Sequence, residues 1–215
     1  MQKLPISKIS FSFNFIPIDL PIEEKDLTEL FKKGSTMFTL TEEVSALNFS
    51  LLRVQNDNSI ASLYIKPGVA GIENFIPSIG FEMELKRMEE FFKYYFLINN
   101  IKMISSCQID IESSCQATFT GSIRNLIKGT NLIFPEGYLF RELKRKSHLK
   151  LGVKLSFSIS KTFYKIYVEP HPKNGNLNLV RFSSKSDNPF PMERAMKEIK
   201  EQIDFFAKHI PPILP

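Results

Sequence analysis

The side chains that most often carry out catalysis are few and widely separated in this sequence. The histidines, His148, His171 and His209, are far apart and lack the spacing of metal ligands. The cysteines, Cys107 and Cys115, match no zinc pattern and have no evident histidine partner that would activate a nucleophile. A catalytic set that only folding assembles would leave no such local motif. We therefore expect no enzyme, no metal and no cofactor.

Two segments come closest to a phosphate-binding motif. Lys66 to Gly71 reads KPGVAG, but it lacks the lysine-serine ending of a P-loop and opens no predicted helix. The basic cluster from Arg141 to His148 is a candidate for phosphate contact, although a solvated loop or helix face explains it more simply. Neither segment identifies a nucleotide-binding protein.

The charge of the chain is divided unevenly between its halves. Residues 1–100 carry 10 Lys and Arg against 13 Asp and Glu, whereas residues 101–215 carry 18 against 10. The formal net charges are therefore −3 and +8, within a total of +5. A basic half is compatible with a polyanionic partner, and equally with a well-solvated surface.

The composition is that of a folded protein with a substantial core. Of the 215 residues, 43% are hydrophobic and 24% are charged, which fits one sizeable domain or two intimate halves. The two cysteines are best explained by a reducing compartment. No apolar run approaches the roughly 20 residues needed to cross a bilayer, and no N-terminal signal is visible. We expect an intracellular protein with no membrane partner.

The first half is predicted to begin with a strand and to end with a long helix. Ile9, Phe11 and Phe13 alternate with polar residues, and this period of two indicates a strand. Apolar residues at every third or fourth position indicate the amphipathic helix. In order, we predict a strand at Lys8–Phe15, a helix at Glu23–Lys33, strands at Met37–Thr41, Ala46–Val54 and Ser59–Lys66, a loop or short strand at Gly68–Pro77, and a helix at Met83–Phe96.

The second half repeats this outline. The final helix has the cleanest apolar stripe in the chain, with Pro191 suited to its first turn and Pro211 to its end. Residues 112–148 carry no clear pattern. We predict strands at Met103–Ile111, Leu151–Ser160, Phe163–Glu169 and Leu177–Ser183, and a helix at Pro191–Phe206. The repeated outline predicts an internal duplication, with one repeat at residues 1–100 and the other at 101–215, intertwined as one domain.

Three local matches resemble the TATA-binding protein family. The first predicted strand is followed by Asp19-Leu20 at the distance at which the family has its Asp-Leu pair. The second half opens with KMISSCQI, which is similar to the family run N-I-V-G-S-C-D-V. Leu52 to Tyr64 aligns without a gap with the family's central hairpin. The resemblance covers nearly the whole chain and is highly divergent, of the kind expected in viruses or fast-evolving eukaryotes.

The resemblance implies an α+β fold: a duplicated saddle with a curved antiparallel sheet and two long helices on its convex face. It implies a transcription initiation factor that binds and bends double-stranded, preferably AT-rich promoter DNA. In this family the concave face of the sheet lies in the minor groove, and wedge residues insert between base steps at both ends. The implied partners are other initiation factors or polymerase subunits, and the implied location is the nucleus or another site of transcription.

The resemblance also implies which residues contact DNA. The wedge positions, which are phenylalanines in the family, fall at Leu47 and Tyr64 in one half and at Leu151 and Tyr167 in the other. Arg53 matches an arginine of the hairpin and would contact phosphate. Its counterpart in the second half is Ser156, and the family's central asparagines fall at Ser7 and Lys102. The residues implied to face the groove are Ile9, Phe11, Ile104 and Ser106.

Three other functions are compatible with the sequence. Duplicated saddle folds can lose DNA binding and act as protein-interaction modules, which would fit the acidic first half. A sheet with a long helix can instead hold an apolar ligand, and the 20 phenylalanines would suit such a cavity. Small saddle-like domains are also fused to some nucleic-acid enzymes whose catalytic domain lies elsewhere.

Overall fold

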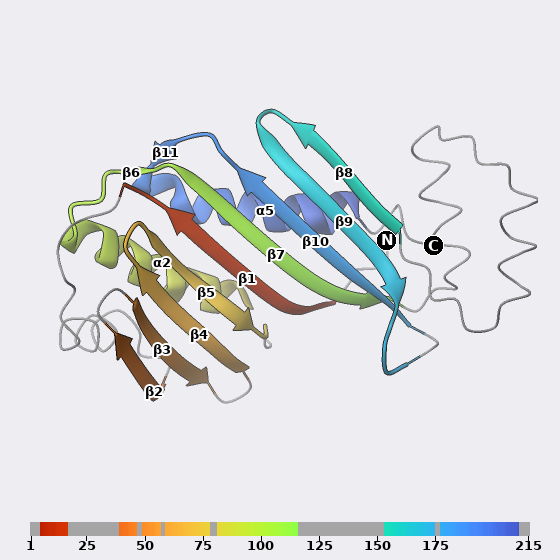
Figure 1. Cartoon of the computed structure of the whole chain (residues 1–215), viewed down its shortest axis with the longest axis horizontal. Helices are drawn as coiled ribbons and strands as arrows, with labels where there is room; N and C mark the ends of the chain where they lie inside the picture. Colours follow the sequence, from red (N-terminus) through yellow and green to blue (C-terminus); the bar gives the residue numbers. More distant parts are fainter. Residues whose placement is uncertain are drawn as a thin grey trace, which may run out of the picture.

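A curved antiparallel sheet of nine strands dominates the α+β structure (Figure 1). The computed structural model describes residues 5–16, 39–46, 49–56, 59–77, 81–115, 153–174 and 177–210. The strand order is β2-β3-β4-β5-β1-β7-β10-β9-β8. The strands are β1 (Ile6–Asn14), β2 (Thr39–Ala46), β3 (Phe49–Asn56), β4 (Ser59–Lys66), β5 (Val69–Phe75), β7 (Ser106–Cys115), β8 (Val153–Ile159), β9 (Thr162–Pro170) and β10 (Asn178–Ser186).

Three shorter elements and two long helices complete the described structure. β6 (Met103–Ile104) pairs with β11 (Phe190–Pro191) in a separate two-stranded sheet. Helix α2 (Phe81–Ile98) follows the first group of strands. A 3₁₀ turn, η1 (Met192–Arg194), leads into helix α5 (Ala195–His209) after the second group. Among the described helices, none is long and apolar enough to cross a membrane.

The two halves of the sheet are built in the same order from the centre outwards. The opening strands, β1 and β7, pair with each other at the centre. On one side β1 also pairs with β5, followed by β4, β3 and β2. On the other side β7 pairs with β10, followed by β9 and β8. Each opening strand therefore lies beside the last strand of its own half.

One face of the sheet is apolar and is covered by both helices. Cross-strand partners point to the same side, and Ile9, Ile111 and Phe182 form one such row across β1, β7 and β10. All three are buried. Phe92 of α2 packs on Phe13 at a ring-centroid distance of 5.2 Å. Because β10 meets α5 on the same side of the sheet, the two helices share one face (Figure 1).

Both predicted long helices are confirmed, with their apolar stripes turned to the sheet. In α2 the stripe is fully buried, and Phe92 and Phe96 add edge-on contacts to Phe13. In α5 the ring of Phe206 lies 5.5 Å from that of Phe182. The buried stripe residues are Leu85, Met88, Phe92 and Tyr95 in α2 and Met196, Ile199, Ile203 and Phe206 in α5.

The structure decides one prediction that was left open, and other predictions lie outside the described residues. Of the loop or short strand expected at Gly68–Pro77, the strand is confirmed: the segment contains β5, whose Ala70 and Ile72 are buried and pair with Phe13 and Phe11. The predicted helix at Glu23–Lys33 and the basic cluster near residue 145 lie outside the described residues.

Candidate interaction surface on the sheet

The sheet face turned away from α2 and α5, called the open face below, is polar. On β1 it carries Lys8, Ser10, Ser12 and Asn14, which alternate with the buried residues of the core. The same alternation continues on the other strands, because the side chains of a strand point to opposite faces in turn. The open face also includes Ser62, Tyr64, Lys66, Gly71, Glu73, Gln108, Asp110, Glu112, Lys154, Ser156, Ser158, Phe163, Lys165, Tyr167, Glu169, Arg181, Ser183 and Lys185.

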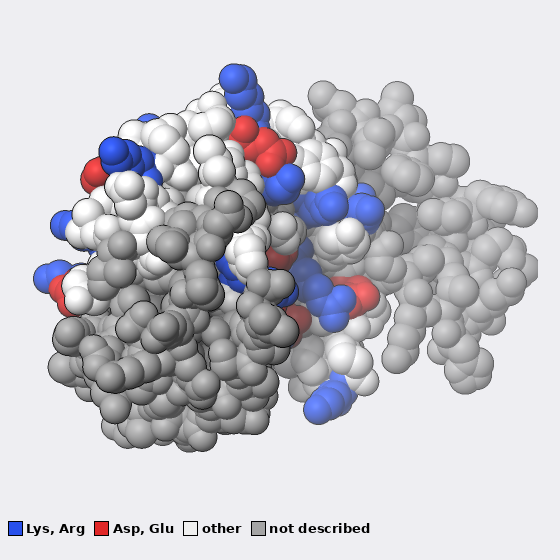
Figure 2. Space-filling view, turned by 60° about the vertical axis from the view of Figure 1, so that its left-hand side comes forward, with Lys and Arg blue, Asp and Glu red and all other residues white. Residues whose placement is uncertain are grey.

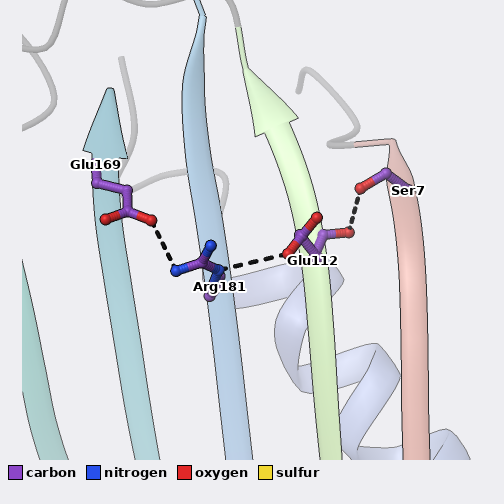
Figure 3. A network of polar contacts seen from close by, with 4 residues as sticks. All are labelled: Ser7, Glu112, Glu169 and Arg181. Atoms are coloured by element: carbon purple, nitrogen blue, oxygen red, sulfur yellow. Dashed lines mark hydrogen bonds and ion pairs between the residues drawn. The ribbon is translucent and has the colours of Figure 1, made fainter. Parts of the chain in front are cut away.

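A hollow of about 360 Å³ lies near the centre of the open face. Arg181 lines this hollow and forms ion pairs with residues of both neighbouring strands. Its Nη1 lies 2.7 Å from Oε1 of Glu169, and its Nε lies 3.4 Å from Oε2 of Glu112 (Figure 3). The hydroxyl of Ser7 donates a hydrogen bond of 2.9 Å to the carbonyl oxygen of Glu112 (Figure 3). This network links β9, β10, β7 and β1 across the sheet.

The hollow contains more carboxylates than cations. Arg181 and Lys8 line it, and so do Glu73, Asp110 and Glu112. Oδ2 of Asp110 accepts a hydrogen bond from Nε2 of Gln108 at 2.9 Å, which leaves its charge in place. On the side of the molecule shown in Figure 2, basic and acidic side chains are mixed rather than separated. The centre of the open face is therefore not a basic surface.

Two tyrosines occupy equivalent positions on the open face. Ser10 and Asp110 are partners at the centre, where β1 meets β7. Two residues further along each strand are Ser12 and Glu112. On one side, the cross-strand partner of Ser12 is Gly71 on β5, and the partner of Gly71 is Tyr64 on β4. On the other side, the partner of Glu112 is Arg181 on β10, and the partner of Arg181 is Tyr167 on β9. Tyr64 and Tyr167 therefore lie at corresponding steps from this central pair, one in each half of the sheet.

The two tyrosines have different surroundings. Tyr64 lies over Gly71, where an added Cβ would be only 2.7 Å from the tyrosine hydroxyl oxygen. Burial raises the pKa of Tyr64, while its hydrogen bond to Ser12 acts in the opposite direction. Tyr167 lines the central hollow. Each ring has a lysine beside it, with Nζ of Lys66 5.5 Å from the Tyr64 centroid and Nζ of Lys154 5.4 Å from the Tyr167 centroid.

The four residues predicted to face a DNA groove are all buried. Ile9 and Phe11 are buried on the helix-covered face, because the helices rather than the open face take the apolar residues of β1. Ile104 is buried where β6 pairs with β11. Ser106 is also buried, and its hydroxyl accepts a hydrogen bond from Nδ2 of Asn14 at 2.9 Å. The predicted groove-facing orientation is therefore wrong for Ile9 and Phe11, whereas Ser106, as the cross-strand partner of Asn14, points to the side of the open face.

The other predicted DNA contacts are only partly described. Leu47 and Leu151 lie outside the described residues. Arg53 pairs with Ser62 of β4 in the sheet, and its side chain is not described. Ser156, its expected counterpart, is exposed on the open face. Of the predicted contacts, Tyr64 and Tyr167 are the pair that the fold brings to equivalent places.

The sequence interpretation missed the charged centre of the open face. Arg181 lies within a predicted strand, and its alternation with Val180 and Phe182 was a usable signal that it faces away from the core. Glu112 begins the stretch to which no structure was assigned. Their ion pair depends on the register between β10 and β7, which no local pattern encodes.

The described side chains suit hydrogen bonding, ion pairing and ring stacking. Burial raises the pKa of the Cys107 thiol to about 12, so this group is a poor nucleophile at neutral pH. Within the described ranges, no three His, Cys, Asp or Glu side chains come together as metal ligands would. The described phenylalanines of the core pack on one another through ring contacts, as Phe13 does with Phe92 and Phe96.

Neither the scan against protein-family models nor the search of curated proteins found a match.

Proposed function

We propose that this chain is a highly divergent saddle protein of the TATA-binding type, which binds and bends double-stranded DNA through the open face and acts in transcription initiation. The proposal includes a duplicated saddle with both helices on its convex side. It is supported by the strand order, which runs outwards in the same way from β1 and from β7. It is also supported by the placement of both helices on one face, which leaves the opposite face for a ligand.

The observation that carries the proposal is the equivalent placement of Tyr64 and Tyr167. They lie in rows that start from Ser12 and Glu112, on opposite sides of the centre. A protein that kinks a duplex at two points needs two wedges related in this way. Their rings are large and amphipathic, and each has a lysine nearby that is suited to a phosphate.

The centre of the open face offers short polar side chains to the minor groove. Ser10, Ser12, Asn14 and Gln108 can donate hydrogen bonds. The minor groove of A·T pairs presents only acceptors, whereas G·C pairs add a protruding donor. Such a surface favours AT-rich DNA, which also contains the easily deformed TA steps. The central carboxylates oppose binding, so we expect modest affinity that depends on the lysines further out.

A fluorescence-anisotropy titration with short AT-rich and GC-rich duplexes at two salt concentrations tests the proposal. We expect tighter binding to the AT-rich duplex and weaker binding at higher salt. Absence of binding to both duplexes at low salt would sink the proposal.

The wedge assignment has its own test. Replacing Tyr64 or Tyr167 with Ala should reduce DNA bending, measured by energy transfer between end-labelled dyes, more than it changes the salt slope of binding. Tyr94→Ala on α2, a partly buried tyrosine away from the open face, is the matched control. Bending that is unchanged in both open-face variants would contradict the assignment.

A protein-interaction role without DNA binding is the second candidate. It is favoured by Glu73 and Asp110, carboxylates in the central hollow that would repel phosphate and attract a basic partner. A photo-crosslinking residue at position 10 distinguishes the two roles. It should trap DNA under the first proposal and a basic protein, such as another initiation factor or polymerase subunit, under the second.

A further inference from the structure

Aromatic and basic side chains form a strip at one side of the open face. The strip consists of Phe163, Lys165 and Tyr167 on β9 and Lys154 on β8, and is called the aromatic-basic strip below. The three β9 residues alternate with buried Tyr164 and others of the core, so they point to the same face. Phe163 is 39% exposed, so its ring is accessible on this face.

Each ring of the strip has an ammonium group over it, in a cation–π arrangement. Nζ of Lys165 lies 5.2 Å from the ring centroid of Phe163, and Nζ of Lys154 lies 5.4 Å from that of Tyr167. Neither lysine forms an ion pair with a residue that the structure describes. In contrast, the cations of the adjacent strand β10 are paired, Arg181 with two glutamates and Lys185 with an aspartate. The charges of the strip are therefore not neutralised by these neighbours.

The spacing of the two rings indicates what they can hold. Phe163 and Tyr167 are four residues apart on one strand, which corresponds to about 13 Å at about 3.3 Å per residue. Neighbouring bases of one duplex strand are stacked about 3.4 Å apart. A base whose flat face lies on a ring has lost its stacked neighbour on that side, so bases on both rings belong to a strand whose own stack is broken. Lys165, between the rings, lies where the connecting backbone would pass.

We propose that the aromatic-basic strip binds an unpaired nucleic-acid strand. Bases stack on Phe163 and Tyr167, and Lys154 and Lys165 contact the phosphates. Every base has a flat aromatic face, so this mode has little sequence preference and strong salt dependence. The inference rests on the geometry of the strip and does not require duplex binding. If the proposed duplex binding also holds, the strip would hold one strand of a locally opened duplex.

Anisotropy titrations of the full chain with labelled oligo-dT and oligo-U test this inference. We expect both to bind, because stacking and phosphate contact are common to DNA and RNA, and the tighter of the two identifies the natural source. Phe163→Ala should weaken binding roughly 5- to 150-fold, the range found when a stacking ring is removed. Phe163→Leu should lose most of the same affinity, since it keeps an apolar side chain but no ring.

Variants outside the strip serve as controls. Leu97→Ala removes an exposed apolar side chain of α2, and Lys197→Gln removes an exposed charge of α5. Both should bind the oligonucleotides as the original chain does. Tyr64→Ala should affect duplex binding alone. The inference is overturned if neither oligonucleotide binds at about 50 mM salt, or if Phe163→Leu binds them unchanged. Duplex binding that persists in either case would leave the proposed function standing.

Discussion

Tyr64 and Tyr167 hold equivalent positions, yet the first is more firmly fixed. Tyr64 covers Gly71 and is hydrogen-bonded to Ser12, so its ring lies against the sheet. Tyr167 has Arg181 as its neighbour in the row and lines a hollow. Before a packed ring can insert between base pairs, its contacts with the sheet must be broken. The free energy of breaking them adds to the free energy of bending the DNA. At the scale of single residues, we therefore expect the second half to kink DNA more readily than the first.

Gly71 provides the sharpest test of this packing. A Cβ at position 71 would clash with the carbonyl oxygen of Phe11 on β1 and with the Tyr64 hydroxyl. Gly71→Ala should therefore destabilise the protein by about 1–3 kcal/mol, measured by urea denaturation. Most of this loss should persist when Tyr64→Ala is added, because the backbone of Phe11 cannot move aside as a side chain can. Full recovery in the double variant would show that the tyrosine alone restricts the site.

At the scale of elements, periodicity predicted the helices and most strands but not which face of the sheet a ligand would meet. Ile9 and Ser10 alternate plainly, so the strand and its two faces could be read from the sequence. The assignment of Ile9 to the ligand side came from the family resemblance and was wrong, because the two helices need an apolar surface to pack on. The row from Glu112 to Tyr167 depends on long-range register and was beyond local patterns.

Helix α5 should make stability depend on pH through Glu198. Burial raises the pKa of this carboxyl, and nearby Glu201 adds to the shift, while Arg194 and Lys197 oppose it. The folded state thus holds the proton more tightly than the unfolded state, whose pKa is near 4.5. The stabilising contribution is fully present below pH 4.5 and is lost as pH rises through the higher folded-state value.

Glu198→Gln tests this dependence because it keeps the shape of the side chain and removes its titration. Relative to the variant, the original chain should lose stability between pH 4.5 and 7, measured as the midpoint of urea denaturation at several pH values. Glu90→Gln, at an exposed position on α2, is the control. Parallel pH profiles for the original chain and Glu198→Gln would contradict the assignment.

At the scale of the whole molecule, the open face is electrically uneven. Its centre holds the carboxylates of Asp110 and Glu112, whereas Lys154 on β8 and Lys165 on β9 lie nearer to one edge of the sheet. A polyanion on this face would be attracted at one side and repelled at the centre. Orientation on DNA would follow from this arrangement rather than from the sequence of bases alone.

Asp110→Asn should strengthen duplex binding. Removing one exposed like charge from the centre is expected to tighten binding roughly 2- to 5-fold at low salt, and less at high salt because exposed charges are screened. Anisotropy titration of the same AT-rich duplex measures the change. Asp204→Asn on α5 removes a charge from the helix side and should have little effect. Equal changes in the two variants would show that net charge alone governs binding.

The seam between β1 and β7 also constrains how the chain reaches this structure. The hydrogen bond from the Ser113 hydroxyl to the carbonyl oxygen of Pro5 joins positions 108 residues apart. Contacts of such long sequence separation raise contact order and slow folding. During synthesis, β1 has one edge unpaired until β7 emerges, and an unpaired strand edge is a template for association with other chains. The unpaired edge of β1 in the nascent first half is therefore a place where association with other chains can begin.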